Sequence, residues 1–217
     1  MTTNALTTLT QHNTTNAIQA LNAINLDASS NVNRADQSVQ TGGNALELTQ
    51  SGEGSNNKQA ANLVIAGYIN NASQTVSDVG AVSITHTGAN SNNIQALNMA
   101  IATGSSGTQV NGLTQSVNAA SVSFNIDGGT GNIQAGNYLQ ANSADDVTQQ
   151  FIVTGNVTYA GTGTNNLQAG NAVIKETGGA SITNLTQTFS ANNVNTSYSD
   201  SFGSGSIKAA NYFSTRL

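Results

Sequence analysis

The chain has 217 residues, and 120 of them are asparagine, glutamine, threonine, serine or glycine, whereas only 7% are charged and none is proline, cysteine or tryptophan. Without cysteine there is no disulfide framework and no thiolate metal site, and the two histidines, His12 and His86, lie too far apart in the sequence to suggest a metal centre. A net charge of −5 with only five lysines and arginines lacks the basic footprint of a nucleic-acid-binding or anionic-membrane-binding protein, so we expect neither partner.

Residues 1–15 form an N-terminal segment that precedes the first repeat. This segment has no basic cluster and no apolar stretch of the kind found in signal peptides. No run elsewhere approaches the roughly 20 apolar residues of a membrane span, so we expect no membrane insertion. If the protein is exported, we expect its signal peptide to have been removed from this chain.

From residue 16 onward the chain repeats one motif, here called motif a, with a mean period of about 38 residues, which is typical of solenoids. Its last copy carries Lys208 where the others carry glutamine. The six copies are Asn16–Asn22, Asn57–Asn62, Asn93–Asn98, Asn132–Asn137, Asn166–Asn171 and Ser206–Asn211. We predict a single repeat domain over residues 16–217, with repeats at 16–55, 56–91, 92–130, 131–164, 165–204 and a partial repeat at 205–217.

Two further motifs lie between the copies of motif a. Motif b places a glutamine two residues before a valine or phenylalanine, at Asp36–Val39, Ser73–Val76, Thr114–Val117, Thr148–Phe151 and Thr186–Phe189. Motif c alternates apolar and polar residues, at Ala45–Leu48, Val82–Thr85, Val122–Ile126, Val157–Tyr159 and Val194–Tyr198. Alternation, β-branched residues and Gly/Asn corners predict three short strands per period.

A helix is the alternative for motif a, because the segment Ile94–Ile101 contains good helix formers. The equivalent segments contain Gly136 and Gly170 and are too short for a stable helix, so the pattern favours a strand. The fold class predicted is therefore all-β: a β-solenoid of about six stacked coils with parallel, in-register cross-β stacking.

Alternation divides each motif a strand into two faces. The face with Ile94, Ala96, Asn98 and Ala100 is apolar apart from its asparagine, so we predict that this face points into the core. A buried asparagine needs partners, and coils stacked about 4.7–4.8 Å apart allow amide-to-amide bonding along the column. The predicted interior ladder is Asn22, Asn62, Asn98, Asn137, Asn171 and Asn211, and a second ladder on the other face is Gln19, Gln59, Gln95, Gln134 and Gln168. Lys208 ends the second ladder, either as a cap that limits further pairing or through drift in a degenerate last repeat.

The ends of such a column are open strand edges, which can template another chain. Natural solenoids usually block their ends with caps, and the sequence shows no capping helix. We therefore expect head-to-tail association with further copies of the same chain, a heterologous contact that does not close and so grows into a filament.

The pattern of Val82–Ile84, a Gly/Asn corner and Asn93–Asn98 resembles the imperfect repeats of bacterial functional amyloid subunits, above all the Fap fibril family. The sequences Gln134–Asn137 and Gln168–Asn171 also resemble the curlin repeat of curli. The resemblance implies an extracellular, cell-surface fibre of the biofilm matrix, with an export pore and a nucleator subunit as partners. The Cys-x-x-Cys expected near the C-terminus of a Fap fibre subunit has no counterpart here.

The sequence offers no catalytic constellation, and we predict no enzyme, no cofactor and no metal. Asp145 and Asp146 are adjacent and would point to opposite faces of a strand, so they cannot form an acid/base pair. The segment Gly128–Asn132 is a single near-match to a calcium-binding nonapeptide, which works only in stacked copies.

Two other functional classes stay open. The first is a monomeric ligand-binding solenoid, such as an adhesin, an ice-binding protein or a phage fibre segment; threonines shift position among the copies of motif c, and aromatic residues are few. The second is a condensing disordered polymer, which the fixed phase of apolar residues over six repeats disfavours.

Overall fold

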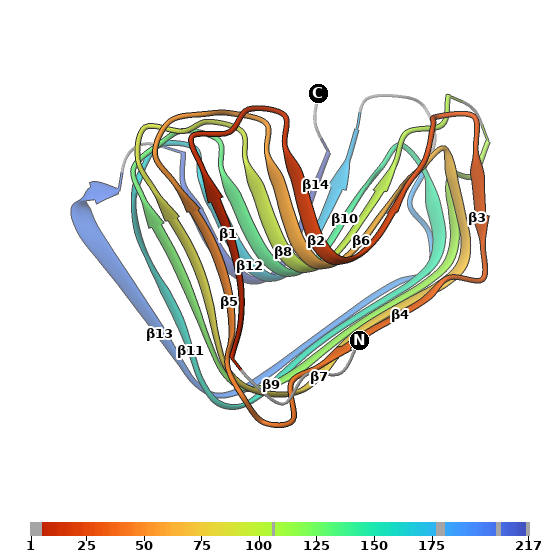
Figure 1. Cartoon of the computed structure of the whole chain (residues 1–217). Helices are drawn as coiled ribbons and strands as arrows, with labels where there is room; N and C mark the ends of the chain where they lie inside the picture. Colours follow the sequence, from red (N-terminus) through yellow and green to blue (C-terminus); the bar gives the residue numbers. More distant parts are fainter. Residues whose placement is uncertain (1–5, 106, 177–180, 203–204, 216–217) are drawn as a thin grey trace.

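A computed structural model of the chain describes residues 6–105, 107–176, 181–202 and 205–215. These residues form strands and connecting turns but no helix. The strands build two parallel sheets that wind into a β-solenoid with the expected period of about 38 residues. The column has about five turns where the sequence predicted about six coils, because six copies of motif a enclose five complete turns. Figure 1 shows the successive coils lying one behind another in the order of their colours.

The six-stranded sheet, called sheet B, consists of the six copies of motif a in sequence order. The pairing is in register, so that Gln95 lies beside Gln134 and Asn98 beside Asn137. The strands are β2 (Ile18–Asn25), β6 (Lys58–Ala66), β8 (Ile94–Ala102), β10 (Ile133–Ala141), β12 (Leu167–Lys175) and β14 (Ile207–Thr215).

Motifs b and c build the eight-stranded sheet, called sheet A, and in most coils they belong to one long strand rather than to two short ones. At Asp78 the backbone turns with a φ of 52°, and the pairing register shifts between Val76 and Val79. Such a bulge lets a strand turn a corner while its ladder continues on both sides. The strands are β1 (Thr7–His12), β3 (Asn31–Asn33), β4 (Asp36–Gln40), β5 (Leu46–Ser51), β7 (Tyr68–Thr87), β9 (Val110–Asp127), β11 (Ala144–Gly163) and β13 (Leu185–Phe202).

Each coil enters motif a through a residue in the left-handed backbone conformation. The φ angles at this corner range from 52° to 81°. Only glycine and, at a smaller cost than other residues, asparagine adopt this region readily, which explains why the position alternates between these two types. The corner residues are Asn16, Asn56, Asn92, Gly131, Asn165 and Gly205.

Sheet B bends sharply in the middle of motif a, and this corrects the predicted interior face. Gln95 and Leu97 point toward sheet A, because Gln95 donates to carbonyls of sheet A and Leu97 packs with its apolar side chains. The next residue, Asn98, also points inward and donates to the Ser116 carbonyl. Two consecutive inward side chains reverse the alternation, so Ala96 lies on the face that points away from sheet A, where it is buried in a separate cluster.

The bend divides the apolar residues into three cores. One core fills the lobe between the first half of each motif a strand and the segment that runs from the valine or phenylalanine of motif b through motif c. A second core fills the lobe between the second half of each motif a strand and the residues that precede motif b. The third contains only residues of sheet B, among them Ala96, Met99 and Tyr138, which pack where the outer face folds on itself. Figure 1 shows this fold as the notch in which β2, β6 and β8 dip between two lobes. Both faces of motif a are therefore buried.

At the bend, the residue of motif a and the apolar residue of motif b in the same coil have complementary sizes: where one is larger, the other is smaller. Leu97 belongs to the same coil as Val117, whereas Gly136 and Gly170 share their coils with Phe151 and Phe189. A methyl group on Gly136 would lie 2.2 Å from a carbon of the Phe151 ring. The Phe151 and Phe189 rings stack with centroids 5.4 Å apart, so the space vacated by glycine is filled by an aromatic column.

This matching predicts that Gly136→Ala destabilises the fold. Overpacking a filled core costs about 1–3 kcal/mol, and the loss should appear as a lower midpoint in urea unfolding of freshly purified protein. Phe151→Val, which restores the valine of the other coils, should partly relieve the effect in the double variant. Simple additivity of the two substitutions would contradict the proposed size matching.

Candidate functional site: the amide ladders and the two end faces

The asparagines of motif a form a continuous hydrogen-bonded ladder through the column. Each Nδ2 donates to the Oδ1 of the asparagine in the following coil at 2.7–2.9 Å, from Asn22 to Asn211. The second N–H of each amide donates to a backbone carbonyl of sheet A, as Asn98 does to Ser116 at 2.9 Å. From Asn22 to Asn171, both donors of each ladder amide are therefore used inside the protein, where an unpaired polar group would be costly.

The glutamines of motif a form a second ladder of opposite polarity. Each Nε2 donates to the Oε1 of the preceding coil at 2.8–3.0 Å, from Gln168 back to Gln19. Lys208 occupies the last position, where its ammonium group donates to the carbonyls of Tyr159 and Ser197. The Oε1 atom of Gln168 is buried and has no hydrogen-bond partner among the described residues. The second ladder is thus interrupted at its C-terminal end.

A third ladder, formed by the glutamines of motif b, was not predicted from the sequence. The donors again point toward the N-terminal end, and the distances are 2.8–2.9 Å. Each Nε2 also donates to a carbonyl of sheet B, as Gln74 does to Met99 at 3.0 Å. The glutamine common to all five copies of motif b was the signal that could have identified this ladder. Its members are Gln37, Gln74, Gln115, Gln149 and Gln187.

Asparagines at the entrance to motif a hold the corners, and these were also missed. The side chain of Asn93 accepts a hydrogen bond from the backbone N–H of Asn57 in the preceding coil at 2.8 Å, and Asn132 does the same for Asn93 at 3.0 Å. Ser206 takes this role for Asn166 in the last coil. The signal was present in the repeat alignment, where asparagine precedes the motif a strand in most copies.

The two ends of the column are open, and core positions are exposed there. Val194 and Phe213 occupy columns that are fully buried in the middle coils, yet each is 49% exposed, because no further coil covers them. All the exposed large apolar side chains in the described part of the chain belong to the first or the last coil. They are Leu6, Ile18, Leu26, Val194, Ile207 and Phe213.

The N-terminal end face presents a defined set of amide atoms. Asn22 Oδ1 accepts no hydrogen bond from the described residues, while both of its N–H groups are used. Gln19 and Gln37 each have one N–H engaged, with the carbonyls of Thr10 and Leu63, and one N–H left over. The N-terminal end face therefore offers one hydrogen-bond acceptor, in the asparagine ladder, and one hydrogen-bond donor in each of the two glutamine ladders.

The C-terminal end face carries the reverse set in two of the three ladders. Asn211 uses one N–H toward the Gln187 carbonyl and has a second N–H left. Gln187 uses both N–H groups, so its Oε1 is available as an acceptor. The backbone carbonyl acceptors inside the column fix each amide orientation, so these polarities follow from the hydrogen-bond network.

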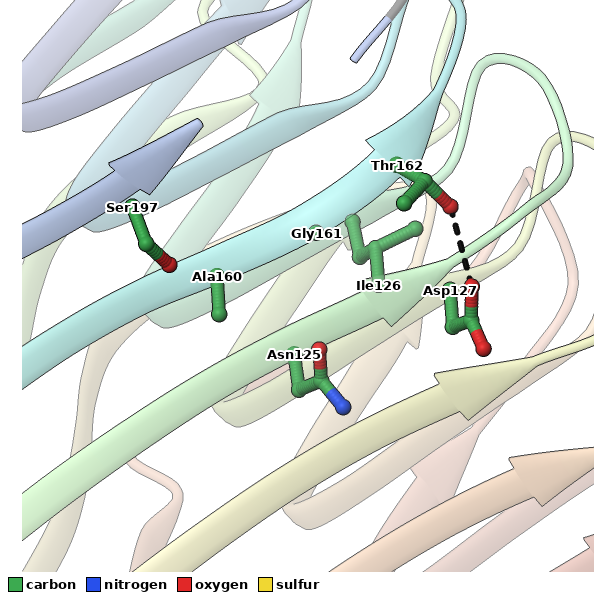
Figure 2. Close-up of a pocket in the computed structure, with 7 residues that line it drawn as sticks. All are labelled: Asn125, Ile126, Asp127, Ala160, Gly161, Thr162 and Ser197. Carbon is green, nitrogen blue, oxygen red and sulfur yellow. Dashed lines mark hydrogen bonds between the residues drawn. The ribbon is translucent and has the colours of Figure 1, made fainter. Parts of the chain in front are cut away.

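The hollows on the described surface are lined mainly by uncharged polar and small apolar side chains. Figure 2 shows the residues of β9, β11 and β13 that line a pocket of about 350 Å³, among which Thr162 donates to the carboxylate of Asp127 at 3.0 Å. Asp127 is the one ionisable group among its lining residues. Asp145 accepts hydrogen bonds from Thr183 and Asn184, and Asp146 sits at a corner with a φ of 53°, so the two carboxylates do not act as a pair.

The described ranges contain no group of three or more His, Cys, Asp or Glu residues placed to hold a metal ion. No helix able to span a membrane occurs in the part of the chain that the structure describes. Comparison with protein-family models, with curated proteins and with solved structures finds no match to this chain.

Asn98→Ala tests the asparagine ladder. The change leaves one N–H of the Asn62 amide and the Asn137 oxygen without their ladder partner and removes a donor to the Ser116 carbonyl, so the free energy of unfolding should fall by about 3 kcal/mol or more. The matched control is Asn118→Ala on the exposed face of β9, which should change stability by less than about 0.5 kcal/mol. Equal effects in denaturant unfolding would refute the ladder.

Gln109, which directly precedes β9 and lies outside the strands, would not serve as such a control. It is buried, its side chain donates to the Gly104 carbonyl, and it accepts from the backbone of Asn142.

His86 interrupts a short column that begins with two hydrogen-bonded glutamines. Gln50 donates to Gln11 at 2.7 Å, and His86 lies next to Gln50 in register. Both ring nitrogens of His86 and the Gln50 Oε1 are buried without partners among the described residues. Burial lowers the pKa of His86 to about 4, so the folded protein keeps this imidazole neutral.

The lowered pKa of His86 makes stability depend on pH. The unfolded chain binds a proton near pH 6.5 and the folded chain only near pH 4, so stability is lost as pH falls between these values, by up to about 3 kcal/mol. In His86→Gln the side chain should bond to Gln50 and remove this loss. Thermal unfolding at pH 7.5 and pH 5 should show a smaller decrease for the variant. An identical decrease in both proteins would contradict the assignment.

Proposed function

We propose that the protein is a structural subunit of an extracellular functional-amyloid fibre that polymerises head to tail by stacking of its solenoid ends. The observation that carries the proposal is the state of the two end faces, where core columns and amide ladders stop without a cap in the described residues. An open edge of backbone and amide groups is a template for another strand.

The ladder polarities favour one mode of association. When the C-terminal face of one copy meets the N-terminal face of the next, Asn211 can donate to Asn22, and Gln37 can donate to Gln187. Two like faces would meet through a two-fold axis with their strands reversed, so the parallel, in-register ladders would not continue across the contact. The favoured contact is heterologous and continues without closing, as a filament requires.

The stacked copies would bury the apolar positions that are exposed at the ends. Ile24 occupies the same column as Phe213, and Val39 occupies the same column as Phe189, so each lobe of the core would continue across the junction. Burial of apolar surface would then add to the amide bonds and the backbone ladder. The sequence resemblance to Fap fibril subunits supports a place in the biofilm matrix and partners in export and nucleation.

One observation favours the alternative of a monomeric solenoid that binds a ligand through a flat face. The exposed hydroxyls that flank the motif b glutamines stay in register across coils, in contrast to the threonines of motif c. One such column consists of Ser73, Thr114, Thr148 and Thr186. The alternative predicts a stable monomer, so the state of association separates the two functions.

The decisive experiment incubates the purified chain at micromolar concentration, followed by electron microscopy and X-ray fibre diffraction. We expect unbranched fibres with a meridional reflection near 4.7–4.8 Å. Phe213→Asp places a charge on the C-terminal end face at a half-exposed position, so the variant should fold but remain soluble. Ile152→Asp introduces the same charge on the side of the column and should still form fibres.

A wild-type chain that stays monomeric would refute the proposal. Fibres that form equally well from Phe213→Asp would show that the end faces are not the contact surface. Circular dichroism of each soluble variant confirms that the strand structure is retained.

A further inference from the structure

We propose that Lys208 slows the stacking of copies at the C-terminal end face. It places a hydrogen-bond donor where the next copy needs a hydrogen-bond acceptor. The inference rests on the proposed function and names a residue that regulates the same contact. It arises from the polarity of the glutamine ladder in motif a.

Gln59, Gln95 and Gln134 each donate to the preceding coil, donate to sheet A and accept from the following coil. Gln134, for example, donates to Gln95, and it also donates to the carbonyls of Ile84 and Asn125 in sheet A. Its own Oε1 accepts from Gln168 in the following coil. A glutamine at the C-terminal end would therefore leave its Oε1 open to the next copy.

Lys208 reproduces the bonds to sheet A. Its ammonium group donates to the carbonyls of Tyr159 and Ser197, which are the counterparts of the carbonyls used by Gln134. The Gln168 Oε1 beside it stays buried and without a partner. An ammonium group has donors only, so Lys208 cannot accept a hydrogen bond from a further coil.

The opposing residue in a head-to-tail junction is Gln19 of the next copy. Gln19 has one N–H engaged by Thr10 and one left to point at the preceding coil. In the junction this N–H meets the Lys208 ammonium group, donor against donor, while the asparagine ladder and the motif b ladder match. Covering Lys208 also removes a charge from water, and its partial burial already lowers the pKa of this amine.

The chain therefore carries one mismatched ladder and two matched ladders at each junction. The matched ladders set the register and the polarity of the filament. The mismatch weakens the junction without disturbing the interior of the subunit, and it slows the growth of the filament.

The test compares seeded elongation and the concentration of monomer that remains at equilibrium. Lys208→Gln should lower the residual monomer concentration by about tenfold, since a buried donor without an acceptor weakens association by about an order of magnitude. Lys208→Arg retains a group with donors only and should give no such decrease. The control for net charge is Lys58→Gln, which removes the same charge from the outer face of β6 and should behave as the wild type.

Several outcomes would overturn the inference. If fibres of Lys208→Gln elongate at the wild-type rate, or if Lys58→Gln accelerates elongation as much as Lys208→Gln does, Lys208 does not slow stacking. Either result would leave the proposed fibre function intact. If the wild type and every variant remain monomeric, the proposed function itself fails. Glutamine is the residue that the other five coils carry at this position, so the variant should fold, and circular dichroism of the fresh monomer verifies this.

Discussion

The structure depends on the need of buried primary amides for hydrogen-bond partners. An asparagine or glutamine side chain offers two donors and one acceptor oxygen, and leaving these groups unpaired in a core costs several kcal/mol. Stacked strands meet this need because identical amides recur at the strand spacing and bond along the column. Asn98 shows the arrangement, with one N–H bound to the next coil and one to the Ser116 carbonyl. An amide ladder therefore holds the coils in register and ties sheet B to sheet A.

This constraint also explains the unusual cross-section. Sheet B bends so that Gln95 and Asn98 both reach carbonyls of sheet A, although they are three residues apart and would lie on opposite faces of a regular strand. The bend folds the outer face on itself and creates a third core. At Ala96 and its counterparts every coil carries alanine, which fits the close approach of the two halves of the bent sheet. The amide ladders thus require the bend, and the bend requires small residues where the two halves of sheet B approach each other.

The repeat made the architecture predictable. Identical residues recurring about every 38 positions must stack in a solenoid, so the parallel register and the asparagine and glutamine columns followed from the spacing. The inward face of motif a was half wrong, because strict alternation fails where Leu97 and Asn98 both point inward. No local signal marks such a reversal, which depends on the distance between the two sheets. The continuity of motifs b and c was missed for a similar reason, since a bulge at Asp78 resembles a break in the sequence.

In the proposed fibre a column of amides continues from one copy to the next. Helical reconstruction of the fibre by cryo-electron microscopy would reveal this column at the junction between copies. We predict one solenoid path in which β14 of one copy pairs in parallel with β2 of the next and Asn211 lies opposite Asn22. A fibre in which like end faces meet, or in which the copies associate only through their sides, would contradict the account.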